Sequence, residues 1–301
     1  MIHRVWCQWD DITIPDGWRI SNADLESMST EELASISLYV PQYMGGIKAL
    51  SYSEGMTGLR VMQLLVAGFE EAVSFMKEGQ QLCNARGVHD FSTAELAISL
   101  MLAHFKSHRK FAADQTEGRW NHITAGSLYE KRVAIIGAGS IGLKLAAMLS
   151  TFEAKITLFA SYARDEIKSM DDLVKGASLY DCIVIVVPLT DKTRNFIDKK
   201  ILGAMKVGAL IVNIARGPVI NTQDLVDELS RGRISAALDV TDPEPLPSNH
   251  PLWSLPNCQI VPHVGGDSDA FEPQARIFLE RQFKEIAQGL SLRNQIDWRN
   301  S

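Results

Sequence analysis

The chain of 301 residues is long enough for one large domain or two of ordinary size. Its 46% apolar and 22% charged residues are typical of a globular protein, and a net charge of −6 argues against nucleic acid as a partner. No apolar run approaches the roughly 20 residues of a membrane span, and the N-terminus lacks the features of a signal peptide, so we expect a cytoplasmic protein that does not enter membranes.

The first part of the chain has few regular patterns. Residues 60–66 predict a strand and residues 70–77 a helix. Ser92-Thr-Ala-Glu95 has the pattern of a capping box, which predicts a long helix over 94–111. That helix is apolar on nearly every side, so we expect it to be buried, at an interface between domains or subunits.

Two histidines of the predicted helix, His104 and His108, have the spacing of a metal-binding pair. No glutamate follows His104 and no third ligand stands out, so we expect no metal site. The cysteines also lack metal-ligand spacing. Cys83, Cys182 and Cys258 lie in or beside apolar runs and are predicted to be buried thiols.

The middle of the chain alternates short apolar runs with helical segments. Strands are predicted at 133–136, 156–159, 183–187, 209–214, 235–238 and 259–261, and helices at 141–152, 198–205 and 221–231. This rhythm predicts a parallel sheet with helices on both faces. For the whole chain we expect an α/β fold of two doubly wound Rossmann-like domains, with parallel sheets and an active-site cleft between them. A last helix at about 272–288 would return to the first domain. We therefore expect a discontinuous substrate domain (1–91 plus 272–301) and a dinucleotide-binding domain (92–271).

A glycine-rich loop follows the first of these strands and begins a helix. In Gly137-Ala-Gly139-Ser140-Ile141-Gly142, the first glycine permits a tight turn and the second lets a pyrophosphate approach the backbone. The third lets helix and strand pack closely, and the helix N-terminus offers free N–H groups to phosphate. A mere tight turn is the alternative. The context favours a dinucleotide.

The end of the next strand bears on the choice between NADP and NAD. No acid stands there to bind a ribose 2′-hydroxyl, whereas Ser161 and Arg164 could bind a 2′-phosphate. This favours NADP. Asp165 and Glu166 follow at once, however, and a shifted turn would bring one of them to the ribose of NAD. Arg164 as a solvated loop charge is a further alternative.

Three residues beyond the glycine loop have the chemistry to bind and protonate a 2-oxo acid. Arg216 can clamp a carboxylate bidentately, and His263 can give a proton to a carbonyl oxygen. Glu244 would hold the imidazole by its other nitrogen and favour its charged form. Each residue alone is more often a surface charge or a turn residue. Their order behind a dinucleotide loop favours the catalytic interpretation.

Several segments, taken together, resemble the D-isomer-specific 2-hydroxyacid dehydrogenase family. The resemblance runs from about residue 58 to the C-terminus and is carried by 82–89, 137–142, 187–190, 213–217, 237–240 and 262–266. It implies NAD(P)-dependent reduction of a small 2-oxo acid to the D-2-hydroxy acid, with glyoxylate or hydroxypyruvate favoured. It also implies a homodimer that pairs through the cofactor domain.

The resemblance assigns roles to further residues. Arg216, Glu244 and His263 occupy the family's catalytic positions. Ala67 and Gly68 would bind the substrate carboxylate through backbone N–H groups, with Asn84 beside them. Val187 and Pro188 would line the cofactor site, and Asp239 would lie near the nicotinamide carboxamide. The loop at 39–44 matches no family pattern, and it would shape the pocket for the substrate side chain.

Two other functions remain open from the sequence. A D-3-phosphoglycerate dehydrogenase would want basic residues in the first domain, but residues 1–90 hold six lysines and arginines against twelve acids. A non-enzymatic, dinucleotide-sensing corepressor would share the fold and the catalytic residues. Such proteins carry flexible tails, and this chain is compact.

Overall fold

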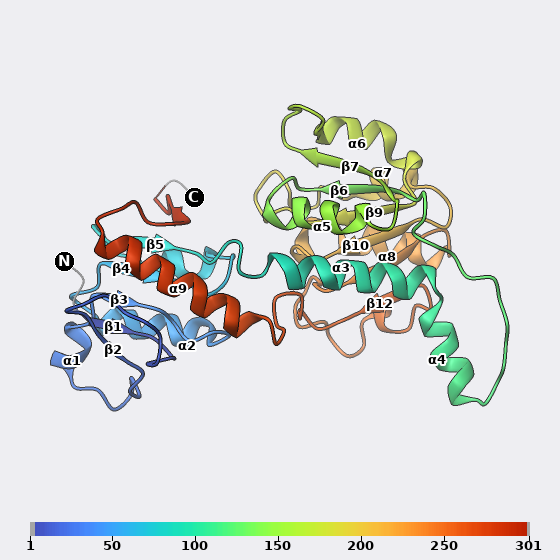
Figure 1. Cartoon of the computed structure of the whole chain (residues 1–301). Coiled ribbons are helices and arrows are strands. Elements are labelled where there is room, and N and C mark those ends of the chain that lie inside the picture. Colours follow the sequence, from blue (N-terminus) through green and yellow to red (C-terminus); the bar gives the residue numbers. More distant parts are fainter. Residues whose placement is uncertain (1–3, 300–301) are drawn as a thin grey trace. The chain divides into compact units, whose positions relative to one another are not determined.

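The computed structural model describes residues 4–299 and divides into two compact units (Figure 1). Unit 1 contains the chain up to His89 and again from Asp269 onward. Unit 2 runs from Asp90 to Ser268. Each unit has its own sheet covered by helices on both faces, which is the α/β architecture predicted from the sequence.

The sheet of unit 1 is parallel except at one edge. Its order is β13-β5-β4-β3-β1-β2, and only β13 runs antiparallel to its neighbour. The order 2-1-3-4-5 of the parallel strands is the flavodoxin-like form of a doubly wound sheet. The strands are β1 (Arg4–Trp6), β2 (Arg19–Ser21), β3 (Leu38–Tyr39), β4 (Val61–Gln63), β5 (Gln81–Cys83) and β13 (Gln295–Ile296).

Alternate residues of these short strands enter two separate cores. Val5, Leu38 and Val61 pack against helix α9 (Phe271–Ala287). Their neighbours Trp6, Tyr39 and Met62 pack on the opposite face. The elements there are α1 (Thr30–Ala34), α2 (Gly46–Ser51) and the 3-10 helices η1 (Tyr52–Gly55) and η2 (Glu70–Phe75). The helix predicted at 70–77 is therefore a shorter 3-10 helix.

The sheet of unit 2 is parallel throughout, in the order β12-β11-β10-β9-β6-β7-β8. The strands are β6 (Arg132–Ile136), β7 (Lys155–Ala160), β8 (Lys168–Ser169), β9 (Cys182–Ile185), β10 (Leu210–Asn213), β11 (Ser235–Leu238) and β12 (Cys258–Ile260). The next strands in the sequence, β7 and β8, lie on one side of β6, and the later strands, β9 to β12, lie on its other side. The topological switch point, where such sheets bind ligands, therefore lies between β6 and β9.

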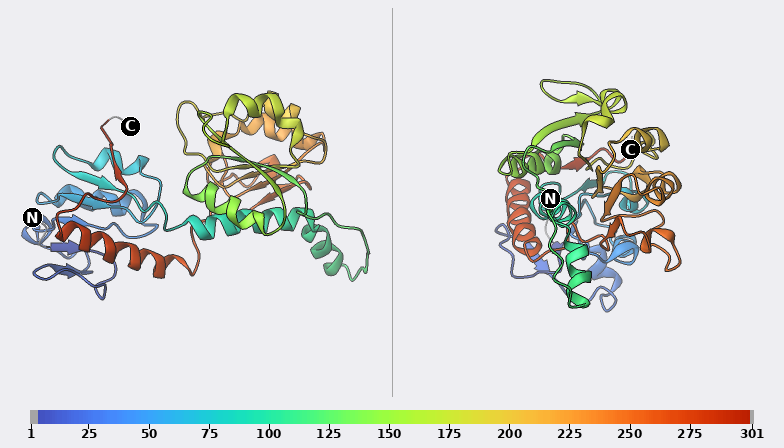
Figure 2. Two further views of the ribbon diagram at one scale, coloured as in Figure 1. Left: turned by 45° about the horizontal axis from the view of Figure 1, so that its top comes forward. Right: turned by 90° about the vertical axis from the view of Figure 1, so that its right-hand side faces the viewer.

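Two layers of helices cover this sheet, as Figure 2 shows. Val133, Ile135 and Val184 face the layer of α3 (Asp90–Phe105) and α5 (Ser140–Ser150). Ala134 and Ile183 face the other layer. That layer and its connections contain α6 (Met170–Gly176), η3 (Ala177–Leu179), α7 (Lys199–Ala204), η4 (Gly217–Val219), α8 (Thr222–Ser230) and η5 (Pro251–Trp253). Burial on both faces explains why these strands are nearly continuous apolar runs.

The long helix predicted at 94–111 differs from the structure at both ends. Helix α3 begins at Asp90, so Ser92 and Glu95 lie inside it and the predicted capping box is wrong. The helix ends at Phe105, and Ser107 has a left-handed φ of 58° that separates it from α4 (His108–Thr116). The buried side chains of α3 pack against α5 and the sheet of the same unit, which accounts for their apolar character without a partner.

All four cysteines are buried free thiols, as predicted for three of them. Burial raises the pKa of the Cys7 thiol to about 11 and those of Cys83 and Cys258 to about 12. Among the described residues, no helix combines the length and apolar character needed to cross a bilayer.

Candidate active site

The glycine loop connects β6 to α5 at the switch point. Gly137 has a φ of 119°, and a side chain there would lie 2.6 Å from the carbonyl oxygen of Val186. A side chain at Gly142 would collide with the carbonyl oxygen of Gly137. At Gly139, by contrast, a Cβ would meet nothing within 4 Å. Packing therefore explains two of the glycines, and the open space beside the third leaves room for a ligand.

The N-terminus of α5 presents its first amides to this open space. Gly139 is the N-cap residue and supplies no side-chain cap, so the first amides of the helix lack a capping acceptor. The Ser140 hydroxyl donates to Asp90 at 3.0 Å, which ties the loop to the start of α3. Together with the positive end of the helix dipole, these amides fit the pyrophosphate of a dinucleotide.

The segment after β7 carries the residues predicted to choose the cofactor. Ser161 and Arg164 are both exposed, and none of the described side chains forms an ion pair with Arg164. Two backbone hydrogen bonds of 3.0 and 2.8 Å join Arg164 to Ile167. They close a turn in which Asp165 has a φ of 50°. The two acids therefore occupy the tip of this turn and not the end of the strand.

The loop after β9 lies on the other side of the switch point. Val187 is buried and Pro188 is exposed. The Thr193 hydroxyl donates to the Pro188 carbonyl at 2.7 Å and fixes the loop. Because β9 is the neighbour of β6, Val187 and Pro188 stand beside the glycine loop at the same sheet edge.

Arg216 follows β10 in a turn that its neighbours hold closed. The Asn213 side chain accepts from the Ala215 amide and donates to the Arg216 carbonyl, both at 3.0 Å. Gly217 allows this turn to approach the next strand's loop, since a Cβ there would collide with the Thr241 carbonyl. The half-buried guanidinium donates to the Ala215 carbonyl at 2.7 Å. No described carboxylate forms an ion pair with it, so its charge is available to an anion.

The predicted pair of His263 and Glu244 is present in the structure. His263 Nδ1 lies 2.5 Å from Glu244 Oε1, and the other carboxylate oxygen accepts from the Thr241 amide at 3.3 Å. Both side chains are partly exposed, at 46% and 40%. With Nδ1 engaged by the carboxylate, Nε2 is the ring nitrogen left to meet a reactant.

A buried carboxylate holds the backbone around His263. Asp239, at the end of β11, accepts from the Val264 amide at 2.7 Å and from the Gly265 amide at 3.1 Å. Its own carbonyl accepts from the His263 amide at 2.8 Å. Burial raises the pKa of Asp239, opposed by the two amide bonds. Sequence reasoning placed this carboxylate near the nicotinamide. It missed that Asp239 anchors the loop around His263. The local signal for this role is an acidic residue directly after a buried strand.

The sheet brings the predicted residues of unit 2 to one edge. The glycine loop, Ser161, Val187, Arg216 and His263 follow five different parallel strands, whose carboxyl ends all meet at that edge. The strands that precede Arg216 and His263 are separated only by β11. Since neighbouring strands lie about 4.8 Å apart, the two strand ends are about 10 Å apart, which suits groups that hold opposite ends of one small molecule.

The predicted substrate loop lies wholly in unit 1. Ala67 is exposed and Gly68 half-buried, after β4. Buried Asn84 donates to the Ala67 carbonyl at 2.7 Å and accepts from the Arg86 amide at 3.2 Å. The Asn84 side chain, predicted to bind substrate, therefore already serves to hold the loop.

Two buried glutamines that the sequence analysis missed support the same loop. Gln63 donates to the carbonyls of Leu64 and Asn84 at 2.9 and 3.1 Å. Gln282, on the apolar stripe of α9, donates to the Gln63 side chain at 2.9 Å. A glutamine inside a buried strand and another inside an apolar helix stripe are the signals that could have found them.

His104 and His108 fall on different helices, α3 and α4. Burial lowers the pKa of His104. Within residues 4–299, no cluster of three or more histidine, cysteine or acidic side chains has the arrangement of a metal site.

Comparisons with known proteins identify the family of this chain. A family model described as "D-isomer specific 2-hydroxyacid dehydrogenase, NAD binding domain" matches residues 98–265. An uncharacterized protein from the proB 3′ region of Corynebacterium melassecola is 32% identical over 300 residues, 95% of this chain and 97% of the relative. The human glyoxylate reductase/hydroxypyruvate reductase is 34% identical over 224 residues, 69% of this chain and 67% of the relative.

A solved structure has the same fold. It is the NADPH-dependent glyoxylate/hydroxypyruvate reductase of Sinorhizobium meliloti, in complex with NADP and sulfate. It matches with a TM-score of 0.80 at 20% identity, over 99% of each chain. The chain therefore belongs to the D-isomer specific 2-hydroxyacid dehydrogenase family and is an NAD(P)-dependent oxidoreductase.

Proposed function

We propose that this enzyme reduces a small 2-oxo acid to the D-2-hydroxy acid with NADPH, and that glyoxylate and hydroxypyruvate are its preferred substrates. The observation that carries the proposal is the 2.5 Å contact between His263 Nδ1 and Glu244, on the sheet edge that also bears Arg216. The relatives named for glyoxylate and hydroxypyruvate reduction support the substrate class.

Each catalytic side chain has one task in this proposal. The Arg216 guanidinium binds the substrate carboxylate and draws electron density from the adjacent carbonyl. His263 Nε2 donates its proton to the carbonyl oxygen while the bound nicotinamide supplies the hydride. Glu244 holds the imidazole ring in place and stabilises its charged form before the proton leaves.

The two units divide the binding of the reactants. Unit 2 holds the cofactor through Gly137, Gly139, Gly142 and the amides of Ser140 and Ile141. Val187 and Pro188 line its site. Unit 1 binds the substrate carboxylate through the Ala67 and Gly68 amides, and the loop at 39–44 contacts the substrate side chain. Asn84 keeps the Ala67 segment in position, which its 2.7 Å hydrogen bond supports.

NADPH is the proposed physiological cofactor. Ser161 and Arg164 would bind its 2′-phosphate, and the turn that removes Asp165 from the strand end supports this choice. We expect Arg164→Ala to reduce the preference for NADPH over NADH by about 10- to 100-fold in kcat/KM, the loss of one charge-assisted contact. An unaltered preference in steady-state kinetics would remove Arg164 from the account.

We propose that the enzyme is a homodimer that pairs through unit 2. Its support comes from α4 and the segment after it, where Trp120 is 99% exposed, Tyr129 is 59% and Phe111 is 37%. Large aromatic side chains are enriched in protein interfaces and seldom stand fully in water. Analytical ultracentrifugation of wild type and of Trp120→Ala tests the pairing. A wild type that sediments as a monomer would contradict it.

The decisive test of substrate class is a panel of 2-oxo acids with both cofactors. It includes glyoxylate, hydroxypyruvate, pyruvate and bulkier 2-oxo acids, and D-3-phosphoglycerate for the oxidative direction. We expect the highest kcat/KM with glyoxylate or hydroxypyruvate and NADPH. If D-3-phosphoglycerate were the only compound of the panel to be turned over, it would replace glyoxylate and hydroxypyruvate as the proposed substrate.

A further inference from the structure

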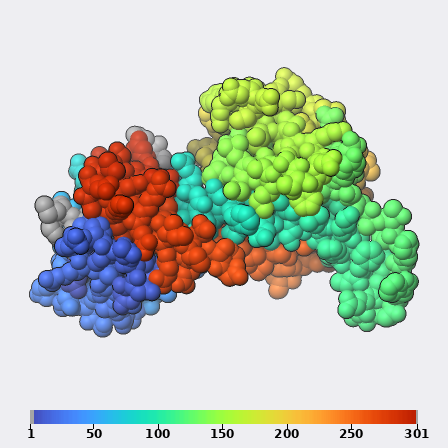
Figure 3. All heavy atoms as spheres, viewed as in Figure 1, coloured from blue at the N-terminus to red at the C-terminus, as the bar shows by residue number. Residues whose placement is uncertain are grey.

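Unit 1 contains a hollow of about 450 Å³ between α9 and the turn that follows β5. Helix α9 lies at the surface of this unit in Figure 3. The polar residues that line the hollow are Arg86, Gln274, Arg281, Arg293 and Asn294. All of them belong to the same unit, so the hollow is complete within it.

The hollow has an excess of positive charge. Arg293 binds Glu285 with two contacts of 2.5 Å, and Arg281 lies 3.4 Å from the same carboxylate. No described carboxylate forms an ion pair with Arg86. Arg281 and Arg293 therefore share one carboxylate and Arg86 has none, in a chain whose net charge is −6. An anion that entered the hollow would meet two uncompensated charges.

One wall of the hollow is apolar. Ile277 is 63% exposed and stands one helical turn from Arg281 on α9, so the two side chains share a face. Buried Val88 lies in the wall that the turn provides. Guanidinium groups beside an apolar wall suit a small organic anion as the ligand better than a metal ion.

The hollow is connected by hydrogen bonds to the loop at 66–68. The Arg86 amide donates to Asn84, whose side chain donates to the Ala67 carbonyl. Asn294 closes the network, because its side chain donates to the Arg86 carbonyl at 2.8 Å and its carbonyl accepts from the Asn84 amide at 3.2 Å. A ligand that fixes Arg86 and Asn294 would therefore also restrict Asn84 and the loop.

We propose that this hollow binds a small dianion, such as a dicarboxylate or a phosphate monoester, and that its occupancy orders the loop at 66–68. Arg86 and Arg281 supply the binding charges, while Arg293 remains paired with Glu285. The binding site does not depend on the proposed function. Only an effect of the ligand on catalysis would rest on the role of this loop in holding substrate.

Calorimetric titration with inorganic phosphate at constant ionic strength tests the site. We expect wild type to bind, and the double variant Arg86→Gln/Arg281→Gln to bind about 100-fold more weakly, since each guanidinium contributes about a tenfold effect. Both side chains are exposed, and neither substitution removes a core contact. Equal binding by the two proteins would place the phosphate elsewhere and overturn the proposal, as would a wild type that does not bind.

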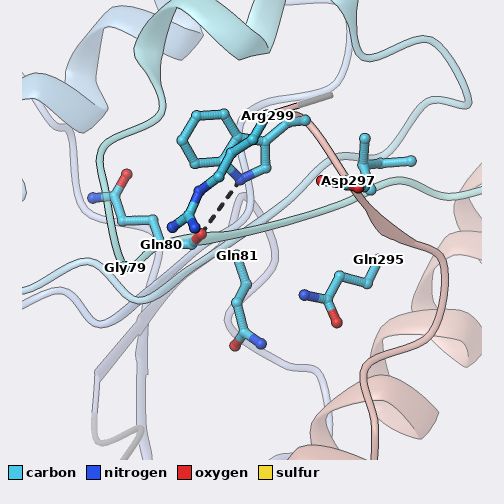
Figure 4. Close-up of a pocket in the computed structure, with 8 residues that line it drawn as sticks. Gly79, Gln80, Gln81, Gln295, Asp297 and Arg299 are labelled. Carbon is cyan, nitrogen blue, oxygen red and sulfur yellow. Dashed lines mark hydrogen bonds between the residues drawn. The ribbon is translucent and has the colours of Figure 1, made fainter. Parts of the chain in front are cut away.

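Arg299→Gln is the matched control. It removes one positive charge from the same unit, where the double variant removes two, and it does so at a different hollow of about 400 Å³ that Trp298 and Gln80 also line (Figure 4). We expect this variant to bind phosphate as wild type does. A loss of affinity equal to that of the double variant would mean that net charge alone causes the effect, and it would contradict the proposal.

Hydrogen exchange measures the connection to the loop without any turnover. Phosphate should slow exchange in the peptide that contains Ala67 and Gly68 in wild type and in Arg299→Gln, but not in the double variant. Unchanged exchange in phosphate-bound wild type would overturn the connection. Because neither readout uses the catalytic reaction, failure of the proposed 2-oxo acid reduction would leave both results interpretable.

Discussion

The two units hold their functional loops by different physical means. In unit 2, a buried carboxylate, Asp239, binds two successive amides beside His263. In unit 1, neutral amide side chains do this work, with Gln63 and Asn84 bonded to the loops after β4 and β5. A charged anchor makes stronger hydrogen bonds, and a neutral one is less costly to bury. The loop that carries His263, the proposed proton donor, thus has the stronger anchor, and the predicted substrate loop the weaker one.

Replacing Arg216, which lies on the same sheet edge of unit 2 as the anchored loop, should have a larger effect on catalysis than removing either anchor. We expect Arg216→Lys to lower kcat/KM for glyoxylate by about 10²–10³-fold, because an ammonium cannot bind a carboxylate bidentately. Steady-state kinetics measure the loss, and the Kd of NADPH should stay within about twofold of wild type. A variant with near-normal kcat/KM would mean that the carboxylate is bound elsewhere.

Removing Asp239, the charged anchor of unit 2, should have the next-largest effect. Asp239→Ala leaves two loop amides without their acceptor, at a cost of about 1–3 kcal/mol for each in the free energy of unfolding. It should also lower kcat more than it raises KM, since the backbone around His263 is released. Urea unfolding and kinetics on the same protein test both parts. Full stability with full kcat would show that the loop needs no anchor.

The neutral anchor of unit 1 should show a smaller and non-additive effect. Gln63→Leu removes one of the partners of Gln282 and the donor to the Leu64 and Asn84 carbonyls, so it should destabilise by about 1–3 kcal/mol, measured by urea unfolding. In the double variant Gln63→Leu/Gln282→Leu, the buried amide of Gln282 is removed as well. We expect the double change to cost less than the sum of the two single changes, and strict additivity would argue against the contact.

Much of unit 2 could be predicted from the sequence, because its strands are continuous apolar runs buried on both faces. Among its strands only β8, of two residues, was missed, and the short helix α6 was missed as well. Unit 1 was harder, since its strands have two or three residues each and too few positions to show a period. The break after α3 was also missed, because it depends on the left-handed backbone at Ser107, a conformation that serine seldom adopts.

The contact between His263 and Glu244 could be predicted, but the hydrogen bonds that hold the surrounding loops could not. Residue types and strand ends suggested that Glu244 would hold His263, and the structure has that contact. The bonds from Asp239 to the loop after β12 depend on how two neighbouring strands end relative to each other. The contact between Gln63 and Gln282 joins residues that are 219 positions apart. No local pattern encodes either distance.

Single-turnover reduction of glyoxylate by bound NADPH measures whether His263 donates the proton in a 2-oxo acid reduction. His263→Ala should slow the step by about 10²–10⁴-fold, the usual contribution of a general acid, with NADPH affinity unchanged. A His263→Ala enzyme that reduced glyoxylate at the wild-type rate would contradict the account.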